Sequence, residues 1–346
     1  MHYFSASLKQ KVFGITKLGK SIEEIKKNII KNCWNGTYFM TSSCHYREFW
    51  ARDFGFFISD LIELGFKKEC RKTLNYALNK FKKKGSITTT ISREGKPFSF
   101  PNAYSVDSLA LLLYSLYVLG DMSLVEKYSS FLQSEIDKFF KNVLDKHGRV
   151  WKDRHFSGMR DYAIRHGSCY DQTMAALLCI RAKQLGFKVK FNDSLMQKRV
   201  LEYWNGNWFD NDKYDKHFAS DSNILPFWTG VIDSKTKFKK VLKFIQSEGL
   251  DNPLPLKYSS EKDEKMHLFE IFVPNWERNQ CWTNIGLLFL KVCYKYNKKA
   301  ALKYRKKFYK VVRKYGTLLE VYDSELKPYT SRFYHSDESM IWIAGL

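Results

Sequence analysis

Apolar residues recur at helical spacing along most of the chain, in segments of two alternating kinds. Segments of the first kind are apolar on nearly every face and cover 52–64, 106–119, 169–185, 222–231, 281–296 and 338–346. Segments of the second kind have one apolar stripe and one face of Lys and Glu, and cover 22–32, 67–84, 124–143, 194–203, 236–248 and 298–315. Such patterns are typical of buried and of amphipathic α-helices, respectively. The chain is therefore predicted to form twelve helices, of which every second one is buried.

Local signals place several helix ends. Ser21 followed by Glu24 is a capping box at the start of the first amphipathic segment. Glycines at positions 65, 85, 120, 186 and 249 follow the last periodic residues, where a left-handed residue commonly ends a helix. Pro226 is expected near the start of its helix or at a bend, because proline lacks a backbone donor. Residues 86–92 alternate and are rich in Thr and Ile, which predicts a short strand or hairpin.

The spacing of the buried segments indicates a closed architecture. Successive buried segments begin about 55 residues apart, a period in the range of repeat and toroidal folds. An inner ring of helices that are apolar on all faces needs an outer ring of helices with one wet face. The expected fold class is therefore all-α, an (α/α)6 toroid with a few short strands in its loops. No linker rich in Pro, Gly or Ser divides the chain, so one domain over residues 1–346 is expected.

The formal charge of +22 raises the question of a nucleic-acid partner. The Lys and Arg residues follow the polar faces of helices, most clearly over 298–314, which is typical of a solvated surface. We therefore expect no nucleic-acid partner, while a weak attraction to anionic polymers stays open. Aromatic residues make up 16% of the chain, and many lie between the helices, where they suit stacking on sugar rings.

The seven cysteines are scattered, without Cys-x-x-Cys pairs or metal-ligand spacing. We therefore expect free thiols in a reducing compartment, the cytoplasm, and neither a cofactor nor a metal site. The first six residues lack the basic and apolar regions of a secretory leader. No apolar run reaches membrane-spanning length, so no membrane association is expected.

Polar residues beside aromatic ones mark the starts of the buried helices. Asp53 follows Trp50 and Arg52 at the first start, and Glu320 lies in an aromatic-rich stretch before the last. In a toroid the loops that enter the inner helices gather at one mouth, which would bring both carboxylates into one cleft. Two carboxylates in an aromatic-lined cleft are the equipment of glycoside hydrolysis. Arg52 in a first helical turn opposes the helix dipole, so we expect it to have a specific partner.

Acids at the other helix starts have two interpretations. Asp107, Asp171 and Asp221 would bind sugar hydroxyls in such a cleft, whereas Asp, Ser and Asn are also the usual helix caps. For Asp221 and Asp337, each beside a serine, both interpretations stay open.

The ordered set of motifs resembles that of six-hairpin glycosidases. Trp50-Ala-Arg-Asp53-Phe-Gly55 resembles the Arg-Asp element of alkaline and neutral invertases and of amylo-α-1,6-glucosidases. Tyr104-Ser-Val-Asp107 resembles the entry to a helix of the invertases. Met159-Arg-Asp161, followed by Tyr170-Asp171-Gln172, is similar to a further pair of invertase motifs. The stretch over 319–323 and the ending Trp342-Ile-Ala-Gly345 resemble the last motifs of invertases and glucoamylases.

This resemblance implies an inverting glycoside hydrolase that trims the ends of α-glucosides or small oligosaccharides. It assigns Asp53 as the general acid and Glu320 as the general base. Asp53 must hold its proton near neutral pH, so we expect burial among aromatic side chains to raise its pKa. Arg52 would lower that pKa if it paired with Asp53, so we expect it to face a sugar hydroxyl or another carboxylate such as Asp107. Glu320 is expected to be ionised, in a wetter setting, near Tyr322.

The expected substrate-binding residues are Trp50, Arg52, Asp107, Asp171, Gln172, Asp221, Trp276, Arg278 and Tyr322. Trp282 is expected either to stack on the sugar or to pack in the core. The chain departs from the invertases at Asn279-Gln-Cys-Trp282, before the fifth inner helix, which leaves the sugar open. Two other functions stay open. One is a sugar epimerase of the N-acylglucosamine 2-epimerase type, which would use histidine pairs, and the other is a non-catalytic barrel that binds carbohydrate or a polyanion.

Overall fold

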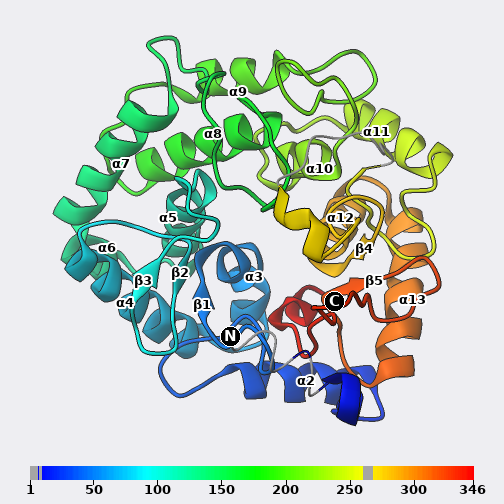
Figure 1. Cartoon of the computed structure of the whole chain (residues 1–346). Coiled ribbons are helices and arrows are strands. Elements are labelled where there is room, and N and C mark those ends of the chain that lie inside the picture. The colour runs from blue at the N-terminus through cyan, green and yellow to red at the C-terminus, as the bar shows by residue number, and fades with distance from the viewer. Residues whose placement is uncertain (1–6, 8–9, 260–267) are drawn as a thin grey trace.

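The inner helices form a closed ring in the structure, which is a computed structural model (Figure 1). The structure describes residue 7 and residues 10–259 and 268–346. Each inner element packs against the next, and the last packs against the first. In chain order these elements are α3 (Ala51–Glu63), α5 (Asp107–Leu119), α8 (Cys169–Gln184), α10 (Ser220–Trp228), α12 (Thr283–Tyr296) and the 3-10 turn η2 (Ile341–Gly345).

An outer layer of amphipathic helices surrounds this ring (Figure 1). It consists of α2 (Ile22–Cys33), α4 (Lys67–Lys84), α6 (Met122–Lys127), α7 (Ser129–Val143), α9 (Asp193–Leu201), α11 (Lys235–Ser247) and α13 (Lys298–Tyr315). Their apolar stripes face inward, as the complete burial of Ile25 and Ile29 in α2 and of Leu74 and Leu78 in α4 shows. The (α/α)6 toroid predicted from the alternation of apolar and amphipathic segments is confirmed.

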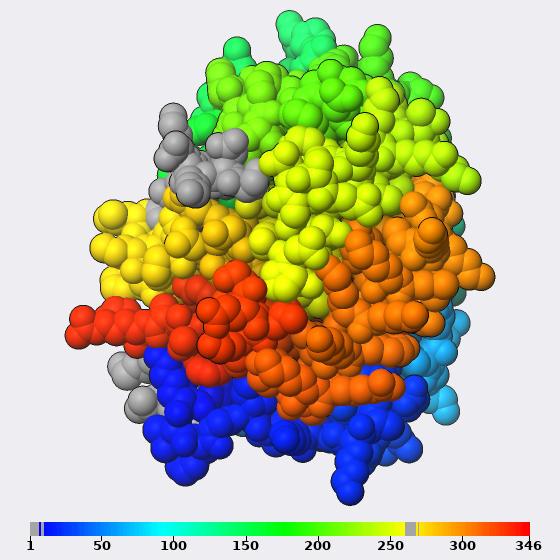
Figure 2. Space-filling model, turned by 90° about the vertical axis from the view of Figure 1, so that its right-hand side faces the viewer, coloured from blue at the N-terminus to red at the C-terminus, as the bar shows by residue number. Residues whose placement is uncertain are grey.

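The first and last segments of the chain complete the ring together. Helix α2 packs against both α13 and η2, so it is the outer partner of the last inner element. The Thr16 amide donates to Glu338 at 2.9 Å, and Lys11 Nζ donates to the Ser331 carbonyl at 2.6 Å. Figure 2 shows this face, where segments near the N-terminus, in blue, lie against the red and orange segments near the C-terminus.

Helix ends with strong local signals agree with the prediction. Helices α4 and α13 span the predicted ranges, and each ends at a glycine in the left-handed conformation, Gly85 and Gly316. Ser21 caps α2 by accepting the Glu24 amide at 3.1 Å. The Glu24 carboxylate accepts the Lys20 amide at 2.8 Å, so the capping box closes one residue earlier than the motif predicts.

Two predicted helices are wrong in part. The segment 124–143 is split into α6 and α7 at Tyr128, whose hydroxyl is held by the Asn75 side chain of α4 at 3.1 Å. The segment 338–346 forms no α-helix. Met340 makes a β-bridge with Ser42, and only the residues that follow it form the 3-10 turn η2. In both places a contact with a segment far away in the sequence decides the backbone, and local periodicity does not encode such a contact.

Short strands lie at the entries to two inner helices. They are β1 (Phe49–Trp50), β2 (Thr90–Ile91), β3 (Pro97–Phe98), β4 (Cys281–Trp282) and β5 (Val321–Tyr322), and one 3-10 segment, η1, covers Leu268–Phe272. Strand β1, which directly precedes α3, belongs to the antiparallel sheet β1-β2-β3, and β4, which directly precedes α12, forms an antiparallel pair with β5. The strand predicted over 86–92 is therefore shorter than expected, and the predicted helix start at 281 is a strand. These two sheets position Asp53 and Glu320.

Pro226 lies inside α10, near its end instead of its start. Proline has no amide hydrogen, so the Ser222 carbonyl, four residues earlier, loses its helical donor. The thiol of Cys169 takes that place, with its sulfur 3.5 Å from the carbonyl oxygen. A contact from α8 thus accommodates the proline.

All seven cysteines are free thiols, and six of them are buried. Among the described residues, no helix combines the length and the apolar composition needed to cross a membrane. The first six residues, on which the expectation of no secretory leader depends, lie outside the described residues.

Candidate active site

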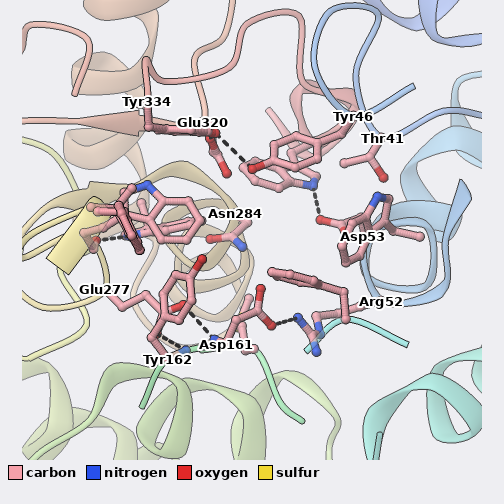
Figure 3. A pocket seen from close by; sticks show the side chains of 18 of the residues that line it. Thr41, Tyr46, Arg52, Asp53, Asp161, Tyr162, Glu277, Asn284, Glu320 and Tyr334 are labelled. Atoms are coloured by element: carbon pink, nitrogen blue, oxygen red, sulfur yellow. Dashed lines mark hydrogen bonds and ion pairs between the residues drawn. The ribbon is translucent and has the colours of Figure 1, made fainter. Parts of the chain in front are cut away.

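One cavity, with a volume of about 440 Å³, lies among the loops that enter the inner helices. Asp53 and Glu320 both line it (Figure 3). Asp53 comes from the first turn of α3, and Glu320 directly precedes β5. Cavities of this size are typical of small-molecule sites. The two acids that were expected to share one cleft do share one.

The side chain of Asp53 is held by the last turn of the ring. Trp342 of η2 donates its indole N–H to Asp53 Oδ1 at 2.8 Å. Burial raises the pKa of Asp53 to about 6, although the charge of Arg52 and the bond from Trp342 lower it. The expectation that burial raises this pKa is confirmed. Asp53 therefore keeps its proton at a pH at which an exposed aspartate has lost it.

Because folding tightens proton binding at Asp53, this group costs stability wherever it is ionised. Its proton leaves near pH 3.8 in the unfolded chain and near pH 6 in the folded chain. The free energy of unfolding of the wild type should therefore fall as pH rises between these values, by up to about 3 kcal/mol at 1.36 kcal/mol per pKa unit. The variant Asp53→Asn should exceed the wild type in stability at about pH 7.5 and approach it at about pH 4. Urea unfolding across this range measures the difference.

Asp233→Asn is the matched control for this measurement. Hydrogen bonds from Tyr296 and Lys295 lower the pKa of Asp233, so its removal should change the pH dependence in the opposite direction. A constant stability difference between Asp53→Asn and the wild type across the pH range would contradict the raised pKa.

Glu320 lies in a drier setting than expected. Only 3% of the residue is exposed, and its Oε2 accepts hydrogen bonds from the Tyr334 hydroxyl and, at 3.3 Å, from the Asp337 amide. Burial, followed by the charge of Asp337, raises the pKa of Glu320 to about 8. Tyr322 is fully buried, and its hydroxyl lies 3.4 Å from the Leu319 amide. The predicted wet, ionised environment of Glu320 is therefore wrong, and Tyr334 is the neighbouring hydroxyl in place of Tyr322.

Arg52 has a carboxylate partner of the expected kind. Its Nε lies 2.6 Å from Asp107 Oδ2, its Nη1 lies 3.4 Å from Asp161 Oδ1, and its Nη2 donates to the Ser157 hydroxyl at 3.3 Å. Arg52 lines the cavity, whereas Asp107 is fully buried and does not. The prediction that Arg52 faces a carboxylate such as Asp107 is confirmed.

Removing Arg52 should destabilise the protein strongly. Arg52→Met keeps most of the side-chain volume but leaves Asp107 buried without its cation, a change that costs about 3–5 kcal/mol. The double variant Arg52→Met/Asp107→Asn should recover much of this loss, because it also removes the buried charge. Chemical denaturation of the complete double-mutant cycle measures the coupling. Strictly additive losses would show that the ion pair contributes nothing.

Two further carboxylates, Asp161 and Glu277, line the cavity. Glu277 accepts the backbone amides of Asp161 and Tyr162 at 2.6 and 2.9 Å. Burial raises the pKa of both carboxyl groups, and the charge of Asp161 raises that of Glu277 further. Both residues lie in stretches that the sequence marks, after Arg160 and after Trp276, but no local signal indicates that they meet across the ring.

Six residues that were expected to bind sugar do not line the cavity: Asp107, Asp171, Gln172, Asp221, Arg278 and Tyr322. The protein itself uses their polar atoms. Asp171 accepts the Ser168 hydroxyl at 2.7 Å, and Asp221 pairs with Arg165 at 2.7 Å. Gln172 accepts the Val150 amide at 3.0 Å, and Arg278 binds Glu270 through two N–H groups at 3.0 Å each. Asp171 is thus part of a helix cap, and Asp221 is one half of a buried ion pair.

Aromatic rings make up most of the remaining wall. Trp50 and Trp276 line the cavity as expected, and Trp282 does so as well. The ring centres of Trp276 and Trp282 lie 4.6 Å apart, and Trp282 donates its N–H to the Trp276 carbonyl at 2.6 Å. The other aromatic residues of the wall are Tyr46, Phe98, Phe100, Tyr162, Phe272, Phe333, Tyr334 and Trp342. Apolar faces interleaved with carboxylates match a sugar ring, which has apolar C–H faces and polar edges.

The fold matches solved structures of glycosidases. A rhamnosidase from Klebsiella oxytoca with rhamnose bound superimposes with a TM-score of 0.65 at 12% identity, over 95% of this chain and 63% of that one. A GH63 mannosylglycerate hydrolase from Thermus thermophilus, in complex with Tris and D-glycerate, gives 0.64 at 10% identity, over 94% and 98% of the two chains. A glycosidase variant in complex with glucose gives 0.66 at 9% identity, over 94% of each chain. The chain has the six-hairpin glycosidase fold.

This fold is the one that the ordered motifs predict, and it is shared without close sequence similarity. No family model and no curated protein matches the sequence. The chain spans about two thirds of the rhamnosidase, 63% of its length, and nearly the whole of the mannosylglycerate hydrolase. The toroid is therefore the shared element, and the chemistry has to be argued from the cavity.

Proposed function

We propose that the chain is an inverting glycoside hydrolase that removes a terminal sugar from an α-glucoside or a small oligosaccharide. The observation that carries the proposal is a single cavity that Asp53 and Glu320 both line and whose wall is largely aromatic. The fold supports it, because the solved structures named above are glycosidases and two of them hold a sugar.

In the proposed reaction Asp53 protonates the glycosidic oxygen while the bond between C1 and that oxygen breaks. Glu320 takes a proton from the water molecule that attacks C1 from the opposite face. The products are the leaving alcohol and a sugar of inverted anomeric configuration, and the net effect on the protein is a proton moved from Asp53 to Glu320. Inversion requires the two carboxyl groups to be roughly 6.5–9.5 Å apart, so that the water fits between them and the sugar.

Mutagenesis has to decide which of the two residues, Asp53 or Glu320, carries the proton that is donated to the glycosidic oxygen. Burial raises the pKa of both carboxyl groups, and that of Glu320 is raised further, so Glu320 binds a shared proton more tightly. The proposed reaction starts from the form with the proton on Asp53, which is the less populated form. The opposite assignment, with Glu320 as the proton donor, starts from the more populated form. The two assignments are separated by the variants Asp53→Asn and Glu320→Gln. The variant that lacks the proton donor should lose more activity on substrates with poor leaving groups than on substrates with good ones.

The dimensions and lining of the cavity favour a short substrate. A volume of about 440 Å³ accommodates a small saccharide and not a long stretch of polymer. Arg52 and Asn284 on the wall offer N–H donors to sugar hydroxyls, beside the aromatic faces. Removal of a terminal sugar is the mode of action that such a cavity suits.

The alternative functions differ from hydrolysis in identifiable ways. An epimerase of the N-acylglucosamine 2-epimerase type would need histidine pairs, and no histidine is among the described residues that line the cavity. A non-catalytic barrel would bind the same sugars without turnover.

Incubation with a panel of α- and β-glycosides, including sucrose, trehalose and maltooligosaccharides, tests the proposed function. NMR identifies the released sugar and the anomer that forms first. An inverting enzyme should release β-glucose from an α-glucoside. Release of α-glucose would overturn the inverting mechanism, and saturable binding without release would indicate a carbohydrate-binding barrel.

A further inference from the structure

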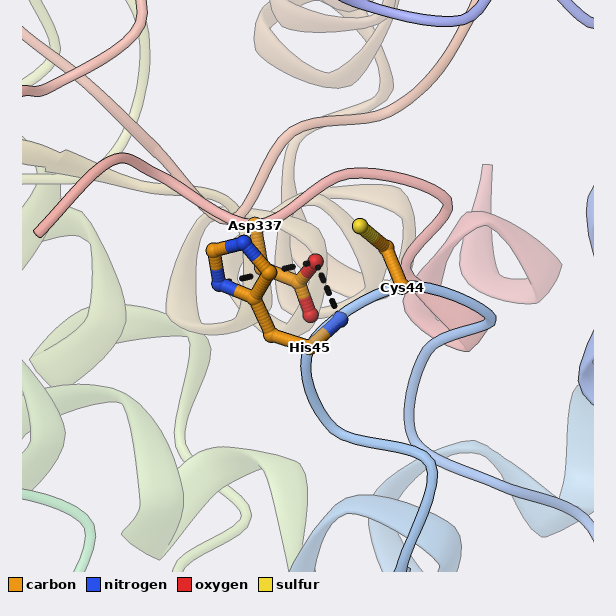
Figure 4. A group of neighbouring side chains, drawn as sticks. All are labelled: Cys44, His45 and Asp337. Atoms are coloured by element: carbon orange, nitrogen blue, oxygen red, sulfur yellow. Dashed lines mark hydrogen bonds and ion pairs between the residues drawn. The ribbon is translucent and has the colours of Figure 1, made fainter. Parts of the chain in front are cut away.

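Three side chains with metal-binding chemistry converge in one cluster (Figure 4). They are Cys44 and His45, from the loop between α2 and β1, and Asp337, from the segment before η2. One ligand atom of each residue, a sulfur, a ring nitrogen and a carboxylate oxygen, lies within 4.8 Å of the other two. None of the three side chains lines the cavity, but the Asp337 amide donates to Glu320 at 3.3 Å, so the cluster adjoins one member of the proposed pair.

His45 is the residue whose surroundings call for a ligand. It is fully buried, and neither Nδ1 nor Nε2 has a hydrogen-bond partner among the described residues. A buried nitrogen without a partner is unfavourable, because it has lost its bonds to water. Nδ1 lies 3.9 Å from Asp337 Oδ1, too far for a hydrogen bond. Two ligands of a tetrahedral zinc ion with bonds of about 2.0–2.1 Å lie roughly 3.3–3.5 Å apart, so a small movement brings both onto one ion.

The backbone holds the Asp337 carboxylate in a fixed orientation. Oδ1 accepts the amides of His45 at 3.0 Å and Glu338 at 2.7 Å, and Oδ2 accepts that of Tyr46 at 3.2 Å. A carboxylate has about four lone-pair positions, and these three bonds leave one of them, on Oδ2, for an ion. Hydrogen bonds of this kind orient the ligands of metal sites.

Cys44 determines which ion the cluster suits. It is the one cysteine of the seven that is partly exposed. Burial and the charge of Asp337 raise the pKa of this thiol, which argues against a free nucleophilic thiolate. A bound cation reverses that balance, because it stabilises the thiolate directly. Sulfur, imidazole and carboxylate together suit Zn²⁺, whereas Ca²⁺ and Mg²⁺ prefer oxygen ligands.

We propose that Cys44, His45 and Asp337 form a Zn²⁺ site that ties the loop before β1 to the segment before η2. The first of these segments carries Tyr46 and the second carries Tyr334, which both line the cavity. The ion would therefore tie these two segments together beside Glu320, with three protein ligands and one position left open. This inference departs from the absence of a metal site expected from cysteine spacing, because one ligand comes from the far end of the chain.

Titration of the metal-free protein with Co²⁺ and then Zn²⁺ tests the site. Co²⁺ bound to a thiolate gives a charge-transfer absorption band, and Zn²⁺ should abolish it as one ion binds per chain. Cys44→Ser should lack the band, and both Cys44→Ser and His45→Gln should bind Zn²⁺ more than about tenfold more weakly than the wild type. His217→Gln is the matched control, because His217 also faces an aspartate, Asp215, but belongs to no such cluster of described residues. It should bind Zn²⁺ as the wild type does.

Alkylation of the folded protein gives a second measurement. Iodoacetamide should label Cys44 before the six buried cysteines, and Zn²⁺ should protect it. Binding far below one ion per chain, or equal affinity in Cys44→Ser and the wild type, overturns the proposal. If Cys44→Ser does not fold, His45→Gln decides, since unchanged affinity in that variant overturns it too. Metal binding is measured without a substrate, so its outcome is independent of the proposed hydrolase activity.

Discussion

Replacing Glu320 by Gln is expected to lower kcat/KM for glycoside hydrolysis by about 10²–10⁴-fold. Gln keeps the length of the side chain and still accepts the hydrogen bond of Tyr334, so the cavity should keep its shape. It cannot take a proton from the attacking water. The loss should therefore be similar for substrates with good and with poor leaving groups. Initial rates with an α-glucosyl fluoride and with an alkyl α-glucoside measure it.

Glu48→Gln is the matched control for this variant. Glu48 is also buried, with 6% exposure, burial also raises its pKa, and it pairs with Arg93 outside the cavity. It should leave kcat/KM unchanged. A comparable loss in Glu48→Gln would show that the effect of Glu320→Gln arises from disturbed folding.

Asp53→Asn is expected to lower kcat/KM by about 10²–10⁴-fold for alkyl glucosides and by much less for the glucosyl fluoride. An alkoxide needs a proton in order to leave, whereas fluoride leaves with far less assistance. Asn retains an oxygen that accepts the Trp342 N–H, so this variant removes the proton donor and keeps the contact. The ratio of the two losses is the quantity to measure, and sugar affinity should be retained.

Two results would reassign the proton donor. Asp161→Asn is the matched variant, because Asp161 also lines the cavity and burial also raises its pKa. If the leaving-group dependence appears in Asp161→Asn and is absent from Asp53→Asn, the donor is Asp161. If it appears in Glu320→Gln instead, the roles of Asp53 and Glu320 are reversed, in agreement with the order of their pKa values.

Helices whose two ends are determined by local sequence signals were predictable over their whole length. The range 298–315 agrees with α13 at both ends, since its apolar stripe and the glycine that follows it are local features. The segment 338–346 was not predictable, because it is apolar like a buried helix but its first residues bridge to Ser42. The start of α12 was misplaced for a similar reason, since 281–282 pair with 321–322.

The candidate site was predictable where a motif placed an acid at a helix entry. Asp53 and Glu320 line the cavity, and Arg52 has its carboxylate partner. Whether an acidic side chain reaches the cavity or is buried behind its wall was not predictable. Asp107 and Asp221 lie in the first turns of inner helices, as Asp53 does, yet they pair with Arg52 and Arg165 in the interior. Only the tertiary structure shows which acids meet buried cations and which reach the cavity.

The closure of the ring by α2 and η2 has a consequence for synthesis on the ribosome. A nascent chain that has reached the fourth inner helix already contains Asp53, but it lacks the wall that carries Glu320 and the Trp342 indole that holds Asp53. Until the last hairpin emerges, α2 and α3 have no neighbours on one side, and their apolar surfaces remain open to chaperones or to aggregation. The cavity that holds the candidate site is thus among the last features of the molecule to form.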